Sequence, residues 1–312
     1  MQSIPYHNGP LPSKQLETLQ SALLAWYERQ RRDLPWRATD DPYAKLVAEV
    51  MLQQTQVDRV IPKYREFLGL FPTFEALAEA ARAEVIRAWS SLGYNMRAVR
   101  LHDIARRVVE EHGGTLPSDP ATLRTFKGLG PYTVAALASF AFGRDAAVVD
   151  TNVRRVLTRL AGYTERPSPK ELDALAQSVL PAGRSPDWNQ AMMDLGATVC
   201  LPRPRCGACP IEAHCASAPV FKRGDGAIAE QRAAYAAPRQ SMFEGSTRYY
   251  RGRVVEALRL APNGLRLSQL RDVVQPEAAL TEFAALVEGL RRDGLVEVYA
   301  GGDAGAAVVQ LP

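Results

Sequence analysis

The chain has 312 residues, 46% hydrophobic and 23% charged, so it can bury a sizeable core and does not have a disordered composition. Its formal net charge of +4 and pI near 8.9 are only mildly basic, which permits a local nucleic-acid-binding patch but does not indicate one. The sequence shows no signal peptide, and no apolar run approaches the roughly 18 residues of a membrane span. We therefore expect a cytoplasmic protein of about two domains.

Up to residue 218 the apolar periods predict helices and no strand. Thr73 is expected to cap one helix, Gly113 to end another, and the Ser168-Pro-Lys-Glu171 capping box to open a third. Residues 33–42 are polar and contain proline, so they predict a loop. The tryptophans at 26, 36, 89 and 188 are assigned to core packing. The predicted helices cover about 14–31, 43–55, 57–70, 73–81, 85–92, 97–112, 131–143, 153–160, 168–179 and 188–199.

A glycine-rich turn precedes the helix predicted over 131–143. Gly128 and Gly130 allow backbone geometry that a Cβ would resist, and Pro131 suits the first turn of a helix. The backbone N–H groups at such a helix start can bind a phosphate. Asp150 follows the apolar run 146–149, and a carboxylate close to a predicted phosphate site indicates chemistry on a nucleic acid.

The last third of the chain has a different pattern. Residues 217–245 carry few large apolar residues and no sustained period, which predicts a linker. Residues 246–312 then predict a small α+β unit that is winged-helix-like. Its three helices are expected over about 250–258, 267–274 and 280–290, and its two strands at 295–299 and 307–311, joined by a glycine-rich turn.

All four cysteines fall within residues 200–215, in the pattern Cys200-x5-Cys206-x2-Cys209-x5-Cys215. This density predicts a ligand set for one metal or cluster and not a disulfide framework. On spacing alone, zinc and an iron–sulfur cluster both remain open. Two loop arginines, at 203 and 205, would add positive charge beside the cluster, although loop arginines are more often simply solvated.

Two carboxyl groups are candidates for acid–base chemistry. Glu49 lies in LVAEVMLQQTQV, where Leu46, Leu52 and Gln53 share its helix face. A carboxyl group among apolar residues would favour its protonated form, as a general acid at neutral pH requires, whereas composition alone favours a surface glutamate. Asp150 on position alone is better explained as an ordinary helix N-cap, which Asn152 could orient.

Three further side chains are candidates for contact with bases. The glutamine pair Gln53 and Gln54 is unusual for a core helix and suits hydrogen bonding to base edges. Tyr94 follows Leu-Gly and is either a core aromatic or an exposed wedge that enters a base stack.

Together these motifs resemble the helix-hairpin-helix DNA glycosylases, and within them the adenine DNA glycosylases. The resemblance covers about residues 14–216. The QQTQ run and NQAMMDLGA are specific to the adenine enzymes, whereas the hairpin identifies only the superfamily. The matching segments are LPWR at 34–37, EVMLQQTQV at 49–57, LGY at 92–94, GLGPYT at 128–133, VDTNVRRVL at 149–157 and NQAMMDLGATVC at 189–200.

The resemblance implies a mainly helical glycosylase domain over 14–216, and a base excision repair enzyme that hydrolyses the N-glycosidic bond of adenine mispaired with 8-oxoguanine or guanine. It implies that Glu49 protonates adenine, that Asp150 faces the sugar with Tyr132 and Asn152 in support, and that Gln54 and Tyr94 enter the duplex. The cysteines become ligands of a [4Fe–4S] cluster. The expected partner is double-stranded DNA at the nucleoid, with no membrane, and the protein is expected to be a monomer.

Several positions depart from the family pattern. Tyr132 stands where bifunctional relatives carry a Schiff-base lysine, so we expect a monofunctional enzyme. The first cysteine gap is one residue short, and Lys127 replaces a usual proline. The C-terminal third does not resemble the MutT-like domain that reads 8-oxoguanine in better-known members. Two alternatives stay open: a thymine or uracil mismatch glycosylase, and a non-catalytic iron–sulfur DNA-binding regulator.

Overall fold

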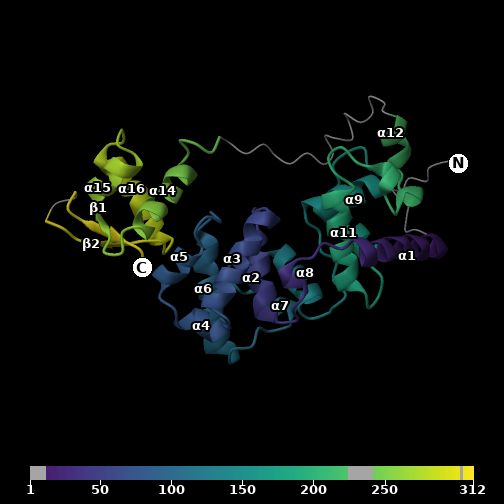
Figure 1. Ribbon diagram of the computed structural model, residues 1–312, viewed down its shortest axis with the longest axis horizontal. Coiled ribbons are helices and arrows are strands. Elements are labelled where there is room, and N and C mark those ends of the chain that lie inside the picture. Colours follow the sequence, from purple (N-terminus) through teal and green to yellow (C-terminus); the bar gives the residue numbers. More distant parts are fainter. Residues whose placement is uncertain (1–11, 224–241, 303–304) are drawn as a thin grey trace. The chain divides into compact units, whose positions relative to one another are not determined.

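The computed structural model describes residues 12–223, 242–302 and 305–312 (Figure 1). The chain forms two compact units. Of the described residues, the first contains 12–45, 118–124 and 129–223, and the second contains 46–117, 125–128, 242–302 and 305–312. Each unit is therefore built from segments that are far apart in the sequence. No helix among the described residues is long and apolar enough to cross a membrane.

The first unit is entirely helical in its described part. Its core lies between α1, α9 and α11, where the buried residues include Leu19, Leu157, Trp188 and Leu195. Its elements are α1 (Ser13–Gln30), η2 (Pro35–Arg37), α7 (Pro120–Arg124), α8 (Pro131–Phe140), α9 (Thr151–Ala161), α10 (Pro169–Ser178), α11 (Ser185–Thr198), η3 (Cys206–Ala208), η4 (Glu212–His214) and α12 (Ala218–Arg223).

The second unit joins a helical half to a small α+β module. The helix α2 (Pro42–Leu52) leads into it. Its helices and strands are α3 (Val57–Leu70), α4 (Phe74–Glu79), α5 (Arg82–Ala88), α6 (Met96–His112), α14 (Thr247–Arg259), β1 (Leu265–Arg266), α15 (Leu267–Val274), α16 (Leu280–Arg292), β2 (Glu297–Tyr299) and β3 (Val308–Gln310).

The three C-terminal helices and the small sheet confirm the winged-helix-like prediction. The sheet has the order β1-β3-β2 with antiparallel pairs, so the last strand lies between the other two. Sequence reasoning missed β1 because a two-residue strand has no period to detect. It also began β2 too early, since Leu295 and Val296 are core residues ahead of the strand.

The module does not have a core of its own. Ile86 of α5 and Val99 of α6 belong to the same buried cluster as Val254, Phe283 and Val309 of the module. The backbone N–H of Ala83 also donates to the carbonyl of Pro312. The module and the helices α5 and α6 are thus parts of one packed unit, although the sequence predicted a separate domain over 246–312.

The predicted linker over 217–245 is partly helical. The helix α12 begins at Ala218, and α14 begins at Thr247, where the Ser246 side chain accepts a hydrogen bond from the N–H of Tyr249. The rest of that prediction, over 224–241, lies outside the described residues.

Helix caps follow the sequence closely. Thr73 accepts the N–H of Ala76, and Ser168 forms the predicted capping box with Glu171. Gly113 ends α6 in the left-handed conformation, as a residue without a Cβ does most easily. Three of the four tryptophans are buried as expected, and Trp26 is partly buried against the same core.

A buried ion-pair cluster holds α11 against the loop after α1. Asp194 is fully buried and accepts hydrogen bonds from the guanidinium groups of Arg32 and Arg37 at 2.6–2.9 Å. Burial alone raises the pKa of Asp194, but hydrogen bonding and charge from Arg37, and then Arg32, outweigh it and hold the pKa below its ordinary value. Arg37 belongs to LPWR and Asp194 to NQAMMDLGA, so this ion pair joins two of the motifs.

We predict that Asp194→Asn lowers the free energy of unfolding by about 3 kcal/mol at neutral pH, because it leaves two arginines facing a neutral group. The folded-state pKa lies below the unfolded value of about 3.9, so the stabilisation is present above that value and is lost as the pH falls. Urea unfolding should show the wild type and the variant converging below about pH 4.

The matched control is Asp187→Asn, on the same helix, where the carboxylate is exposed and pairs with Arg184. It should change stability by less than about 0.5 kcal/mol. A pH-independent difference between Asp194→Asn and the wild type would contradict the ion-pair explanation.

Candidate functional site

Glu49 lies in α2 and is buried, with 7% of its side chain exposed. Its neighbours Val47, Ala48, Val50 and Met51 are also buried, so α2 has no exposed face around Glu49. The interpretation of Glu49 as a surface glutamate is therefore wrong. Removal from water disfavours an ionised carboxyl group, which suits a proton donor.

The helix ends at Leu52, before the residue expected from the sequence, and Gln53 to Thr55 form a turn. Gln54 is exposed and has a backbone φ of 56°, a left-handed value that is uncommon without glycine. A turn of this kind presents the Gln54 side chain to solvent instead of continuing the helix face.

Tyr94 has the same unusual backbone. Its φ is 47°, and its side chain is 39% exposed, so it is not a core aromatic. Two solvent-facing side chains on left-handed backbone, Gln54 and Tyr94, thus lie on two short loops of the same unit. Strained positions of this kind persist only where the surrounding structure holds them.

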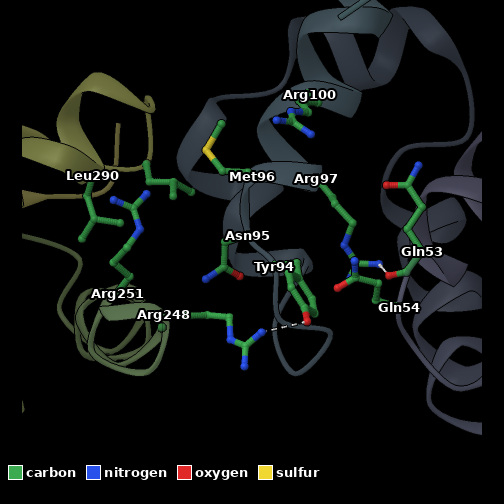
Figure 2. A pocket seen from close by; sticks show the side chains of 12 residues that line it. Gln53, Gln54, Tyr94, Asn95, Met96, Arg97, Arg100, Arg248, Arg251 and Leu290 are labelled. Carbon is green, nitrogen blue, oxygen red and sulfur yellow. Dashed lines mark hydrogen bonds between the residues drawn. The ribbon is translucent and has the colours of Figure 1, made fainter. Parts of the chain in front are cut away.

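Arg97 holds both loops. It is 4% exposed, and its guanidinium donates to the carbonyls of Val50 and Met51 at the end of α2 at 3.1 and 2.7 Å. It also donates to the Gln53 carbonyl and to Thr55 Oγ1. On the other loop it donates to the carbonyls of Leu92 and Gly93 at 3.0 and 3.1 Å. Figure 2 shows Arg97 between Tyr94 and the Gln53–Gln54 turn.

The Arg97 charge also lies over two aromatic rings, with its Cζ 5.4 Å from the Trp89 ring centre and 5.5 Å from that of Tyr94. Burial lowers the pKa of Arg97 to about 10, so the group stays protonated at neutral pH. The sequence analysis missed this residue. The signal was a charged residue on the inward stripe of a helix, since Arg97 shares spacing with Leu101, Ile104 and Val108.

In the first unit, Asp150 is the N-cap of α9. One carboxylate oxygen accepts the N–H of Val153 at 2.6 Å, and the other accepts the side-chain amide of Asn152 at 3.1 Å. The expected hydrogen bond from Asn152 is therefore present. Asp150 is thus also the helix N-cap that its position predicted. This role is compatible with a functional carboxylate because capping fixes the orientation of the carboxylate.

Asn152 is in turn held by Arg155, which donates to its side-chain oxygen at 2.8 Å. Arg155 also donates to the carbonyls of Gly196 and Cys200, at 2.6 and 2.7 Å. A hydrogen-bonded chain therefore runs from Asp150 to the backbone of the first cysteine. The sequence analysis did not single out Arg155.

Gly196 permits this arrangement. A Cβ at this position would lie 2.6 Å from the Cβ of Asn152, a distance at which the two helices could not approach. Asn189, also on α11, fixes the segment ahead of Asp150 because its side chain accepts the N–H of Val148 and donates to the carbonyl of Ala146. Both glycine and amide come from the NQAMMDLGA motif.

The hairpin turn is partly as predicted. Gly128 has a φ of 108°, and a Cβ there would lie 2.9 Å from the side chain of Arg100. Gly130 is the N-cap of α8 with a φ of −78°, and an added Cβ would meet nothing within 4 Å, so the expectation that its backbone needs glycine is wrong. Pro131 opens α8, and Tyr132 on its first turn is half-buried.

All four cysteines line one small cavity in the first unit, beside Arg159, Glu212 and Phe221. None is in a disulfide. Arg159 is 2% exposed and donates to the Cys200 sulfur at 3.3 Å and to the carbonyl of Leu201 at 2.6 Å. A buried guanidinium thus fixes the start of the cysteine loop, and Arg203 and Arg205 are exposed on that loop.

The cysteine set lacks the geometry of a single-ion site. No group of three or more His, Cys, Asp or Glu among the described residues is arranged to hold one metal ion. Burial, with a further contribution from the neighbouring cysteines, raises the pKa of Cys209 to about 11 and that of Cys215 to about 12. A bound cation would be needed to hold Cys209 and Cys215 as thiolates at neutral pH.

The chain is similar to known DNA repair proteins. Residues 47–182 match the family described as "HhH-GPD superfamily base excision DNA repair protein". The adenine DNA glycosylase of Mycolicibacterium smegmatis is 41% identical over 285 residues, covering 90% of this chain and 93% of that protein. The thymine/uracil-DNA glycosylase of Methanothermobacter thermautotrophicus is 34% identical over 208 residues, covering 65% of this chain and 94% of that protein.

Among solved structures, a thermostable thymine-DNA glycosylase superposes with a TM-score of 0.63 at 33% identity, over 66% of this chain and 98% of that one. The two thymine relatives therefore cover about two thirds of the chain. The mycobacterial match covers 90% of it and must include most of the C-terminal module.

We predict that Arg97→Met lowers the free energy of unfolding by about 3 kcal/mol, because several buried carbonyls lose a charged donor at once. Urea unfolding measures the change. Arg106→Met, on the exposed side of the same helix, is the control and should lie within about 0.5 kcal/mol of the wild type. Equal midpoints for the two variants would show that Arg97 does not hold the loops.

Proposed function

The chain belongs to the adenine DNA glycosylases of the HhH-GPD superfamily, and we propose that it releases adenine mispaired with 8-oxoguanine or guanine in duplex DNA. It is a base excision repair enzyme that acts as a DNA N-glycosylase. The structural observation that supports this proposal most is the buried Glu49, five residues before the exposed Gln54, in a turn that Arg97 holds through the Gln53 carbonyl. The reaction would take place at the nucleoid, inside the cell.

Adenine must leave the base stack before its glycosidic bond can be reached. Glu49 then donates its proton to the purine, at N7, so that adenine departs as a neutral molecule. The bond between the sugar C1′ and N9 breaks, and the bonding electrons stay with the base. A protonated, water-excluded carboxyl group is the form that this step requires.

The sugar left behind carries positive charge at C1′, and Asp150 stabilises that charge. Its two oxygens are held by Val153 N–H and the Asn152 amide, so the carboxylate keeps one orientation while charge develops. Water then adds to C1′ and loses a proton, which returns to the Glu49 carboxylate, and the hydrolysis is complete. The division between one neutral and one ionised carboxyl group follows the logic of glycoside hydrolysis.

Tyr132 supports the proposal that the enzyme removes bases without cutting the strand. Strand cleavage through a Schiff base needs an amine at this position, and a phenol cannot form one. Tyr132 instead lies on the first turn of α8, where it would contact the sugar side of the site.

The duplex would be held by two sets of groups. Gln54 and Tyr94 would enter the base stack, with Gln53 beside them, and the open surface at Gly130 would let a phosphate approach the start of α8. The hairpin contact, through Gly128 and Gly130, would fix register without reading sequence.

We also propose that the four cysteines hold a [4Fe–4S] cluster, because all of them line one cavity and four thiols are a usual ligand set for such a cluster. Zinc takes the same ligand set, and metal analysis distinguishes the two. Cys200, Cys206, Cys209 and Cys215 would each hold one iron. When bound, the cluster supplies structural order to the loop, and Arg159 and Arg155 hold the loop's first residues.

A thymine or uracil mismatch glycosylase is the rival enzyme, since relatives of that kind match two thirds of the chain. The longer match to the mycobacterial adenine enzyme favours the first proposal. A non-catalytic regulator is disfavoured by the buried Glu49, because a DNA-binding role does not need that carboxyl group.

We predict that Glu49→Gln reduces adenine release by about a thousandfold or more and leaves duplex affinity within about threefold, since the amide keeps the shape but has no proton to donate. Single-turnover assays on A·8-oxoguanine, A·G and T·G duplexes measure release, and anisotropy measures binding. Glu66→Gln, an exposed glutamate paired with Lys63, is the control.

A near-wild-type rate for Glu49→Gln would rule out its role as the acid. Release of thymine from T·G, with no release of adenine, would instead favour the rival enzyme.

We also predict that protein purified without oxygen is brown and contains about four irons per chain. Cys209→Ser should lose colour and iron and melt at a lower temperature, because the loop loses its cross-link. Iron and zinc analysis with visible absorption measures this. A colourless protein with one zinc per chain would contradict the cluster.

A further inference from the structure

The second unit contains a cavity of about 430 Å³ between the Tyr94 loop and the helix α14 (Figure 2). This is within the size range of small-ligand pockets, roughly 300–1,000 Å³. Its lining combines residues of the Gln53–Gln54 turn, the Tyr94 loop and the C-terminal module. The module contributes Arg248, Arg251, Gly252, Leu290 and Leu295.

The lining has the chemistry of a nucleotide site. Arg100 and Arg248 bring positive charge, no acidic residue lines the cavity, and neither arginine has a carboxylate partner among the described residues. The amides of Gln53, Gln54 and Asn95 can donate to and accept from base edges. Met96 provides apolar surface for a base, the buried Leu290 and Leu295 lie behind it, and the Tyr94 ring provides a stacking face.

The helix α14 is fixed beside the Tyr94 loop. Arg259, near the end of α14, donates to the carbonyl of Ile86 at 3.0 Å and to the side chain of Asn95 at 3.1 Å. At the other end of the helix, Arg248 reaches toward the Tyr94 hydroxyl at 3.4 Å (Figure 2). The module therefore places an arginine against the residue proposed to enter the base stack.

The cation of Arg248 is also flanked by rings. Its Cζ lies 5.9 Å from the Tyr94 ring centre and 5.2 Å from that of Phe243, whose side chain is 54% exposed. Phe243 contacts Tyr249 edge to face, with ring centres 5.5 Å apart. An alternation of exposed aromatic rings and arginine is typical of surfaces that bind unstacked nucleotides.

The cavity is distinct from the place where the extruded base would react, because Glu49 is not among its lining residues. It does contain both residues proposed to enter the duplex. A nucleotide that stays behind when adenine leaves the stack would face these residues.

We propose that this cavity binds the nucleotide opposite the extruded adenine, and that Arg248 of the C-terminal module contacts it. The inference rests on the proposed function for the identity of the extruded base. It assigns to the winged-helix-like module a direct part in sensing the opposite base, with Arg248 as the specificity-determining contact.

The test is equilibrium binding of the full chain to duplexes that carry a 2′-fluorinated, non-hydrolysable deoxyadenosine. The opposite position holds 8-oxoguanine, guanine or a base-free tetrahydrofuran. Arg248→Ala should bind the two duplexes with an opposite base about tenfold more weakly than the wild type, because it loses a charged contact to that nucleotide. On the tetrahydrofuran duplex the loss should fall to about twofold or less.

The matched control is Arg253→Ala, on the same helix but outside the cavity, where the arginine contacts Tyr249 and the Val273 carbonyl. It should bind all three duplexes within about twofold of the wild type. Thermal melting of both variants checks that each is folded.

An equal loss on all three duplexes would show that Arg248 is only a general phosphate contact, and no loss on any would remove it from DNA binding. Either result overturns the proposal, as does an equal effect of Arg253→Ala. Because the readout is binding, it does not depend on base release. If the protein does not excise adenine but Arg248→Ala still weakens binding only when an opposite base is present, the proposed function is wrong and the cavity assignment is still supported.

Discussion

The second unit depends on one buried charge, the guanidinium of Arg97. Taking an arginine out of water is costly unless its donors are satisfied, and here they are satisfied by the carbonyls at the end of α2 and by those of the Tyr94 loop. The cost of burial therefore becomes a constraint on the backbone: neither loop can move without leaving a buried charge or carbonyl unpaired. That constraint maintains the left-handed backbone at Gln54 and Tyr94, whose side chains stay exposed.

In the first unit, two further buried charged groups fix neighbouring segments in the same way. Asp194 is buried between Arg32 and Arg37, which ties α11 to the loop after α1, and Arg159 is buried against the carbonyls at the start of the cysteine loop. Most residues of the motifs that look catalytic in the sequence therefore hold neighbouring segments in place. In NQAMMDLGATVC, the amide of Asn189 fixes the segment ahead of Asp150, and Gly196 lets Asn152 approach closely enough to orient that carboxylate. The chemistry proposed for Asp150 rests on these neighbours as much as on the carboxyl group itself.

The sequence predicted a good part of this. Helix periods, the Thr73 cap, the Ser168 capping box and the winged-helix-like tail follow from local rules, and the structure confirms them. The errors came where tertiary contacts override those rules. For Glu49, composition alone favoured the surface, whereas its apolar neighbours and the family resemblance favoured a general acid, and only the structure shows that the side chain is buried. The roles of Arg97 and Arg155 in holding loops were missed because most of their partners are backbone carbonyls. Every residue has a backbone carbonyl, so the sequence does not show which ones will accept a hydrogen bond.

By itself, then, the sequence determined which elements form and which residue types could carry acid–base chemistry, since these depend on local spacing and side-chain properties. Only the tertiary structure decided the environment of each group. Three features depend on contacts between segments that are distant in the chain. They are the burial of Glu49, the position of four cysteines around one cavity, and the contact of α14 with the Tyr94 loop. The physical reason is that desolvation and hydrogen-bond satisfaction depend on every group around a side chain, and most of those groups arrive from elsewhere in the sequence.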